Sequence, residues 1–281
     1  PTSMDLPYTR IKGGVCAARE FLGSAISCGI KNPKSDRLDL SLIYSKIGCL
    51  SAGMFTQNRV KAAPVRVSQS HLRAESLRAI ITNSGNANAC TGPTGMQDAK
   101  NMAKETSKLL GLRQREVGVC STGVIGLPMP MIRIEPKYEG LVAGLGPKNG
   151  NDVARSIITS DTHEKEFAIS FELHGKRVRI GGCAKGAGMI NPNMATMLCF
   201  ITTDANIGKR GLKEAIENSV ENTFNRITID GDTSTNDSVI VLANGAAENK
   251  TIRRGTKECR DFSHALEFVM NKLAKSIVRD G

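Results

Sequence analysis

A lysine and a threonine stand near each other in a stretch whose residue types suit chemistry. Lys185 lies in a glycine-rich turn, where the backbone can take unusual angles and approach a ligand closely. Thr196 opens the apolar run 197–201, which has the length and composition of a buried strand. The lysine offers a positive charge for a carboxylate or phosphate, and the threonine hydroxyl is a potential nucleophile. The residues alone leave these roles open, because glycine-rich turns are common beside strands and threonine favours strands.

A second pair of residues could stabilise a developing negative charge. Residues 116–120 form a short apolar run that leads into 121–126, Ser-Thr-Gly-Val-Ile-Gly. Acyl transfer needs hydrogen-bond donors aimed at the oxygen that becomes negative. Thr122 offers a hydroxyl and Gly123 an unhindered amide, although a plain strand-ending turn would contain the same residues.

Length and composition describe a globular chain. With 281 residues and 40% hydrophobic content, the chain can bury a core in one large domain or two smaller ones. No apolar run approaches the ~20 residues of a membrane helix, and we expect no membrane association. The sequence begins at Pro1 and not at methionine, so we expect a fragment or trimmed chain, with a lost targeting peptide left open. It carries no secretion signal, so secretion is not indicated.

The net charge of +11 raises the possibility of a nucleic-acid partner, but the pattern of the charges argues against it. The basic residues are spread along the chain, Trp is absent and no recognition motif occurs. We therefore expect no nucleic-acid partner, and read the charge as an attraction for small anionic substrates.

Cysteine and acidic residues give no metal pattern. The eight cysteines are scattered without a Cys-x-x-Cys motif, which argues against zinc and against a disulfide framework. The aspartates of 230–237 miss the calcium-loop spacing. We expect no metal, no cofactor and a reducing compartment, either the cytoplasm or, in a eukaryote, an organelle matrix.

The elements that must position these residues can be read from periodicity. Alternating apolar residues at 38–43 predict a strand with one wet face. The segment 96–110 predicts an amphipathic helix ended by Gly111, and His174-Gly175 predicts a hairpin turn between two strands. Short strands interleaved with amphipathic helices indicate an α/β protein.

Several blocks together resemble one enzyme family. They are A-T-M-L at 195–198, N-R-V-K-A-A-P-V at 58–65, N-S-G-N-A-N-A-C-T-G at 83–92, S-T-G-V-I-G at 121–126 and D-G-D-T-S-T-N-D at 230–237. The sequence resembles the ornithine acetyltransferases, the glutamate N-acetyltransferases of arginine biosynthesis, over essentially every residue present. The resemblance implies a four-layer α-β-β-α sandwich similar to N-terminal-nucleophile enzymes.

The resemblance also implies a mechanism. The precursor would cut itself between Ala195 and Thr196, and the freed threonine would carry acetyl from N-acetylornithine to glutamate. Thr122 and Gly123 would stabilise the oxyanion. Lys185, Ser160 and Thr196 would bind substrate, with Ser160 replacing a family threonine while keeping its hydroxyl. The block 83–92 is interpreted as a structural loop beside the site.

The implied organisation is one catalytic unit, 1–281, cleaved into an alpha chain, 1–195, and a C-terminally incomplete beta chain, 196–281. Two of each would associate as a heterotetramer, and roughly the last quarter of a family-length chain would be absent. Use of acetyl-CoA as a second acetyl donor, which would make the enzyme bifunctional, stays open. The alternatives are an N-terminal-nucleophile hydrolase or aminopeptidase, and an inactive fragment.

Overall fold

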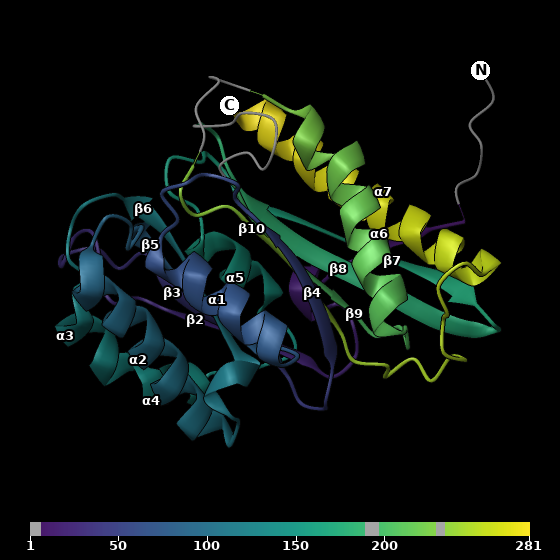
Figure 1. The fold of residues 1–281 in the computed structure, drawn as a ribbon, viewed down its shortest axis with the longest axis horizontal. Helices are drawn as coiled ribbons and strands as arrows, with labels where there is room; N and C mark the ends of the chain where they lie inside the picture. The colour runs from purple at the N-terminus through teal and green to yellow at the C-terminus, as the bar shows by residue number, and fades with distance from the viewer. Residues whose placement is uncertain (1–6, 189–196, 229–233) are drawn as a thin grey trace.

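Two β-sheets lie face to face between two layers of helices (Figure 1). A computed structural model describes residues 7–188, 197–228 and 234–281. One apolar core fills the space between the sheets, and a further core lies beneath each helical layer. The α-β-β-α sandwich expected from the sequence is therefore confirmed.

The smaller sheet has the order β2-β3-β5-β6, in which β5 and β6 run parallel and the other neighbours antiparallel. Its strands are β2 (Phe21–Ile26), β3 (Leu40–Ser45), β5 (Ala79–Asn86) and β6 (Val117–Val124). The helices on its outer side are α1 (Ala63–Ala74), α2 (Gly92–Leu110), α3 (Met131–Ile134) and α4 (Tyr138–Ala143). As predicted, α2 ends at Gly111, whose φ of 65° suits a helix C-cap.

The prediction that β3 has one wet face is wrong. Leu42 belongs to the core under the helices and Ile43 to the core between the sheets, and both are buried. Successive side chains of a strand point to opposite faces, so β3 is covered on both sides. The polar residues that alternate with leucine, such as Ser41, are themselves buried.

The larger sheet has the order β1-β7-β8-β9-β10-β4, in which β9 and β10 run parallel and the other neighbours antiparallel. Its strands are β1 (Thr9–Ile11), β4 (Leu50–Phe55), β7 (Lys165–Leu173), β8 (Lys176–Lys185), β9 (Leu198–Thr203) and β10 (Ser238–Ala243). The predicted hairpin turn joins β7 to β8, because His174 and Gly175 both have positive φ and Leu173 pairs with Lys176.

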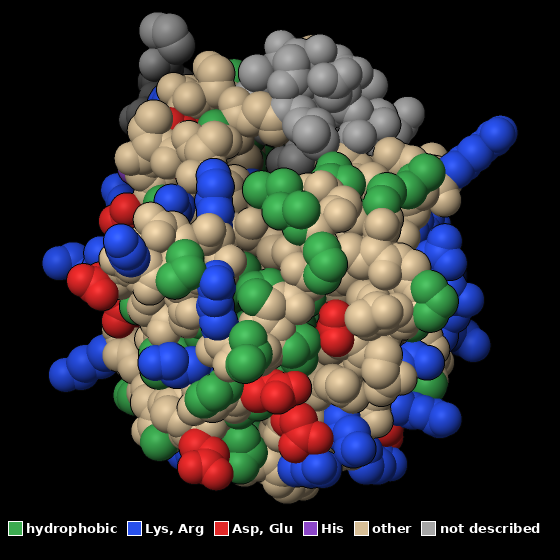
Figure 2. Space-filling view, turned by 90° about the vertical axis from the view of Figure 1, so that its left-hand side faces the viewer, with side chains coloured by type: hydrophobic (Ala, Val, Ile, Leu, Met, Phe, Trp, Pro, Cys, Tyr) green, Lys and Arg blue, Asp and Glu red, His purple; other side chains and the backbone are tan. Residues whose placement is uncertain are grey.

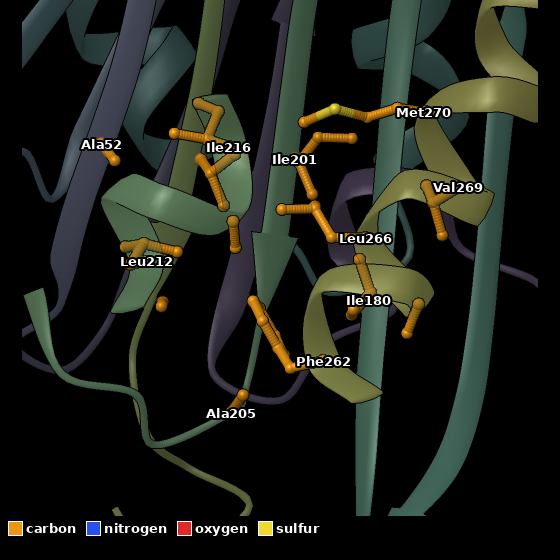
Figure 3. Close-up of a cluster of buried hydrophobic side chains, with 14 of the residues drawn as sticks. Ala52, Ile180, Ile201, Ala205, Leu212, Ile216, Phe262, Leu266, Val269 and Met270 are labelled. Carbon is orange, nitrogen blue, oxygen red and sulfur yellow. The ribbon is translucent and has the colours of Figure 1, made fainter. Parts of the chain in front are cut away.

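Two long helices cover the outer face of the larger sheet. They are α6 (Lys209–Asn222) and α7 (Lys257–Asp280), which lie side by side in Figure 1. Figure 3 shows Leu266 and Met270 of α7 packed over Ile180 and Ile201 of the sheet. Within the described residues no helix is long and apolar enough to cross a membrane.

Candidate active site

The side chains of Lys185 and Thr122 join the two sheets where their strands end. Lys185 is the last residue of β8, so its predicted place in a turn is wrong: the backbone of Lys185 still pairs with Leu198, and the turn begins after it. Thr122 lies near the end of β6. The Lys185 Nζ atom donates a hydrogen bond to Thr122 Oγ1 at 3.1 Å. Since β6 and β8 belong to different sheets, this bond locates the site between the sheets.

The start of β9 lies beside this lysine. Leu198 pairs with Lys185 on one side and with Ser238 on the other. Met197 donates its N–H to Asp237 Oδ1 at 3.1 Å. Ala195 and Thr196, the predicted cleavage site and nucleophile, lie outside the described residues. Their roles stay predictions, but the chain immediately after Thr196 is held at the site.

Polar groups surround the Lys185 ammonium. It donates to Thr159 Oγ1 at 2.8 Å, and Asp161 Oδ2 lies 4.0 Å away. Burial lowers the pKa of Lys185, and the charge of Asp161 opposes this effect. A buried ammonium ringed by hydroxyls can bind a substrate carboxylate, because the charge stands in a poorly screened place.

Asp161 organises the loop beneath this lysine. Its Oδ1 atom accepts from Lys165 Nζ at 2.8 Å and from the Gly186 amide at 2.7 Å, and Oδ2 accepts from the Thr159 amide at 3.0 Å. Burial alone would raise the pKa of Asp161, but Lys185, Lys165 and the two amides lower it below its usual range. The carboxylate therefore stays ionised and fixes the turn after β8.

Gly123 occupies a place that only glycine can fill. Its φ is 134°, and a Cβ there would lie 2.3 Å from the Gly85 carbonyl carbon and 2.5 Å from the Asn86 nitrogen. Beside it, Thr122 accepts from Lys185 and makes no further hydrogen bond within the described residues. A hydroxyl has one proton to donate, so the Thr122 proton is available to a ligand oxygen.

A cavity of about 280 Å³ collects most of the predicted residues. Thr122, Gly123, Ser160 and Lys185 all line it. Its other lining residues are Ala87, Ile125, Thr159, Gly188, Ser234, Thr235 and Asn236. Ser160 is exposed at this cavity, whereas its neighbours Thr159 and Asp161 make the contacts with Lys185.

Sequence reasoning missed the part played by the block 230–237. Asn236 Nδ2 donates to Ala87 O at 2.6 Å and to Ser121 O at 2.9 Å, so it ties the block to the ends of β5 and β6. A run of hydroxyl and amide residues just before a buried strand was the available signal. Within the described residues no group of His, Cys, Asp or Glu side chains could hold a metal ion.

Asp237 was also missed, and it is the most unusual carboxyl near the site. The side chain is fully buried, and its Oδ2 atom has no hydrogen-bond partner in the described part of the chain. Burial raises the pKa of Asp237 to about 7, although the Met197 amide and the charge of Lys185 oppose this. A carboxyl that can gain or lose a proton near neutral pH therefore touches the residue after Thr196.

Comparison with known sequences gives long matches. A protein of Symbiobacterium thermophilum named arginine biosynthesis bifunctional protein ArgJ is 46% identical over 96% of this chain and 67% of its own length. A protein of the same name from Listeria monocytogenes is 43% identical over 96% of this chain. The chain thus spans about two thirds of these relatives, so more lies outside it than the expected quarter.

Comparison with solved structures finds proteins of the same kind. The ArgJ crystal structure from Bacillus halodurans matches with 36% identity and a TM-score of 0.62, over 67% of this chain and 98% of that chain. The ornithine acetyltransferase of Mycobacterium tuberculosis, in complex with ornithine, matches with 35% identity and a TM-score of 0.59, over 66% of this chain. An aminopeptidase of Ochrobactrum anthropi, described as a variant of the Ntn-hydrolase fold, shares the fold at 9% identity and a TM-score of 0.56.

The family itself is matched over residues 23–281, which include the whole cavity and both sheets apart from β1 and the first residues of β2. Together with relatives of more than 40% identity along nearly the full chain, this match assigns the protein. The chain belongs to the ArgJ family.

Proposed function

We propose that this chain transfers an acetyl group from N-acetylornithine to glutamate through an ester on Thr196. The observation that carries the proposal is the bond between Lys185 and Thr122, which joins a carboxylate-binding cation to a hydroxyl donor beside the start of β9. Relatives named bifunctional proteins of arginine biosynthesis support it, as does the solved ornithine acetyltransferase bound to ornithine.

The nucleophile would be made by self-cleavage. A threonine hydroxyl is weak until a base takes its proton, and the most economical base is the α-amino group of the same residue. Thr196 Oγ would attack the carbonyl of Ala195 and displace its own nitrogen, giving an ester that water hydrolyses. The products are a carboxylate on Ala195 and a free amine on Thr196.

Acetyl transfer then proceeds in two displacements. Thr196 Oγ attacks the acetyl carbonyl of N-acetylornithine, and the proton it loses goes through the α-amine to the departing ornithine nitrogen. The amine of glutamate attacks the acetyl ester and regenerates the hydroxyl. Lys185 would hold the α-carboxylate of either amino acid, which is common to both.

Thr122 and Gly123 would stabilise the negative oxygen of each tetrahedral intermediate. The Thr122 hydroxyl is already oriented by Lys185, so little reorganisation is needed when charge develops. Lys185 also places a positive charge near that hydroxyl, which would favour the negative oxygen that the hydroxyl stabilises. Removal of one such donor typically costs on the order of 100-fold or more in rate.

The lengths of the solved relatives support cleavage. Two thirds of this chain covers nearly all of the Bacillus halodurans and Mycobacterium tuberculosis chains. These crystallised chains are therefore about as long as residues 1–195 of this one. A chain cut at the position of Ala195–Thr196 would have that length.

The two pieces would stay together after cleavage. β9 and β10 belong to the piece 196–281, yet they lie between β8 and β4, which belong to the piece 1–195. Separation would break two strand interfaces and strip α6 and α7 from the core. We therefore treat 1–281 as one catalytic unit, and propose that alpha and beta chains form the heterotetramer implied by the resemblance.

Cysteine chemistry does not compete with the threonine at this site. All eight cysteines are free, and burial raises the pKa of Cys120, on the strand that carries Thr122, to about 12. Free thiols support a reducing compartment, which we propose is the cytoplasm, or an organelle matrix in a eukaryote.

Mass spectrometry of protein mixed with N-acetylornithine tests the acetyl intermediate. An acetyl adduct should appear on the peptide that begins at Thr196 and disappear when glutamate is added. Loss of the adduct in water at the same rate would instead identify a hydrolase. Threonine that remains unmodified during turnover would reject the mechanism.

A denaturing gel tests self-cleavage. Wild-type protein should give two bands whose masses correspond to 1–195 and 196–281, and Thr196→Ala should give one band. Thr94→Ala, which alters an exposed hydroxyl on α2, is the matched control and should still be cleaved. The same single band for the wild type and Thr196→Ala would contradict the proposal.

A further inference from the structure

Four buried charges form a line from the end of α7 to the Lys185 ammonium. Asp280 Oδ2 lies 2.5 Å from Lys165 Nζ, and Lys165 Nζ lies 2.8 Å from Asp161 Oδ1. The other oxygen of Asp161 lies 4.0 Å from Lys185 Nζ. The four side chains are at most 5% exposed, and negative and positive groups alternate along the line. Asp280, which does not line the cavity, is thus connected to the lysine that donates to Thr122.

The burial of the two lysines is unusual for this residue type. Figure 2 shows Lys and Arg side chains projecting from one face of the molecule, which is where such side chains normally lie. Lys165 and Lys185 are instead 1% and 4% exposed. A buried cation needs a partner of opposite charge, and water screens its interactions poorly. The loss of one partner therefore changes how strongly the cation interacts with the others.

Lys165 is shared between two carboxylates. It donates to Asp161 Oδ1, to Asp280 Oδ2 and to the carbonyl of His163, the last at 3.2 Å. An ammonium has three N–H donors, so all of its donors are used. Because two carboxylates face one ammonium, neither of them is fully neutralised by it.

Asp280 stays negatively charged in this arrangement. Its carboxylate also accepts from the amide of Thr162 at 3.1 Å and from the Thr162 hydroxyl. Burial alone would raise the pKa of Asp280, but the bonds from Lys165 and Thr162 lower it to about 2. Asp280 is therefore ionised near neutral pH and attracts the Lys165 ammonium.

Asp161 faces two ammonium groups, and its interaction with one weakens its interaction with the other. Burial lowers the pKa of Lys185, the charge of Asp161 raises it, and the charge of Lys165 lowers it again. Without Asp280, the Lys165 ammonium would have Asp161 as its one carboxylate partner among the described residues. Asp161 would then be neutralised by Lys165, and Lys185 would lose the anion that holds it at the cavity.

We propose that Asp280 is a positioning residue for the substrate carboxylate. By sharing the charge of Lys165, it leaves Asp161 able to hold the Lys185 ammonium in place. The inference rests on the proposed function, because it concerns the carboxylate-binding role of Lys185. It adds to that site a residue that does not itself touch the substrate.

The line of charges also crosses the proposed cleavage site. Asp280 belongs to residues 196–281, whereas Lys165, Asp161 and Lys185 belong to residues 1–195. The C-terminal end of one piece would therefore position the substrate-binding lysine of the other piece after cleavage.

Steady-state kinetics of Asp280→Asn test the proposal. Asparagine keeps the size of the side chain and removes its charge. The KM values for N-acetylornithine and glutamate should each rise by about fivefold or more, an effect in the lower part of the range for residues of one ion-pair network. The kcat should change by less than about threefold, because no reacting group is altered. Partial unfolding would do the reverse, since fewer active molecules lower the apparent kcat and leave KM unchanged.

Asp261→Asn is the matched control on the same helix. Asp261 pairs with Lys257 at 3.6 Å, and both side chains are exposed. The variant also removes one negative charge from α7, but it should leave both KM values within about twofold of wild type. Equal KM changes in Asp261→Asn and Asp280→Asn would overturn the proposal, because the effect would then be one of net charge.

The double variant Lys165→Met/Asp280→Asn tests whether Asp280 acts through Lys165. It leaves no unpaired buried ammonium, so it should be destabilised less than either single variant. Asp161 then faces Lys185 alone, and both KM values should return to within about twofold of wild type. A residue that only supported the fold would show no such recovery. KM values raised about fivefold in the double variant would overturn the proposal, even where Asp280→Asn alone does not fold.

Calorimetry with ornithine as the probe separates this inference from the proposed function. Ornithine has the α-carboxylate that we assign to Lys185, and its binding needs no turnover. Asp280→Asn should bind it about fivefold more weakly than wild type, and Asp261→Asn should match wild type. This pattern in a wild-type protein that fails to exchange acetyl would reject the proposed transfer and keep the positioning role. Equal or tighter binding by Asp280→Asn, with exchange by the wild type intact, would reject the positioning role alone.

Discussion

Lys185, at the end of β8, stands directly opposite Leu198, at the start of β9, in the antiparallel ladder of the larger sheet. The pairing sets the lysine backbone beside the chain that immediately follows Thr196. The lysine side chain leaves the sheet to reach Thr122 of the other sheet. One backbone register and one side-chain bond thus bring the chain after Thr196 together with Thr122, which lies 63 residues before Lys185 in the sequence.

Lys185→Met should impair substrate binding while leaving the fold in place. The change removes the ammonium that we assign to the substrate carboxylate, so KM for N-acetylornithine and glutamate should each rise by about 10- to 100-fold, the worth of one hydrogen bond to a charged group. Steady-state kinetics measure this. Lys176→Met, at the exposed start of the same strand, is the control. Unchanged KM values in Lys185→Met would show that Lys185 does not bind the substrate carboxylate.

Thr122→Val should slow the chemistry rather than the binding. Valine keeps the shape of threonine and loses the hydroxyl, so kcat should fall by about 100-fold or more with little change in KM. Ser121→Ala on the same strand is unsuited as a control because Ser121 donates to Asn83 at 2.6 Å. Thr106→Val, on α2 and away from the cavity, serves better. An equal loss of kcat in Thr122→Val and Thr106→Val would show that Thr122 has no catalytic role.

Much of this arrangement could be predicted from the sequence, because several of the patterns depend only on neighbouring residues. Gly111 ends α2 and the His174-Gly175 pair turns β7 into β8, since each is a matter of backbone conformation at one or two residues. The glycine-flanked Lys185 and the Thr122-Gly123 pair were found for the same reason. Their spacing in the sequence could not show that Lys185, Thr122 and Gly123 lie at one site, because the cavity is lined by residues from both sheets.

What escaped prediction depends on distant parts of the chain. Lys165 stands in a charged run, 163–166, that resembles an exposed turn, yet its side chain is fully buried between Asp161 and Asp280. The second of these carboxylates lies 115 residues away at the end of α7. The two buried faces of β3 have the same origin, since its covering layers are formed by remote segments.

Gly123→Ala should destabilise the protein strongly. The new Cβ would meet backbone atoms of Gly85 and Asn86, which cannot move aside as a side chain would. We expect a loss of about 3 kcal/mol or more in the free energy of unfolding, measured by chemical denaturation. Gly126→Ala is the control, because its φ is 84° but its Cβ would meet nothing within 4 Å, so only the backbone cost of about 1 kcal/mol should appear. Equal losses would show that the packing at Gly123 is not decisive.

Lys165→Met should lower the free energy of unfolding strongly, because Lys165 is a buried cation in an ion-pair network. The variant leaves Asp161 and Asp280 facing each other without the ammonium between them. Breaking such a buried pair from one side costs roughly 3–5 kcal/mol in the free energy of unfolding. Lys108→Met, which breaks the exposed pair with Glu105 at 2.9 Å, should cost under about 1 kcal/mol. Equal losses in the free energy of unfolding for Lys165→Met and Lys108→Met, measured by chemical denaturation, would show that the buried ion pairs of Lys165 do not stabilise the fold.

Asp237→Asn should remove a pH dependence of stability. Burial raises the pKa of Asp237 from 3.8 to about 7, so between these values the folded chain holds a proton that the unfolded chain has lost. The carboxyl therefore contributes stability that is fully present below about pH 4 and is lost as pH rises through 7, at about 1.4 kcal/mol per pH unit. Asparagine cannot titrate, so the variant should gain stability relative to wild type from pH 5 to pH 7, and the difference should be level above pH 8. Urea denaturation of both proteins at these pH values measures it, and parallel pH profiles would show that Asp237 is not the group responsible.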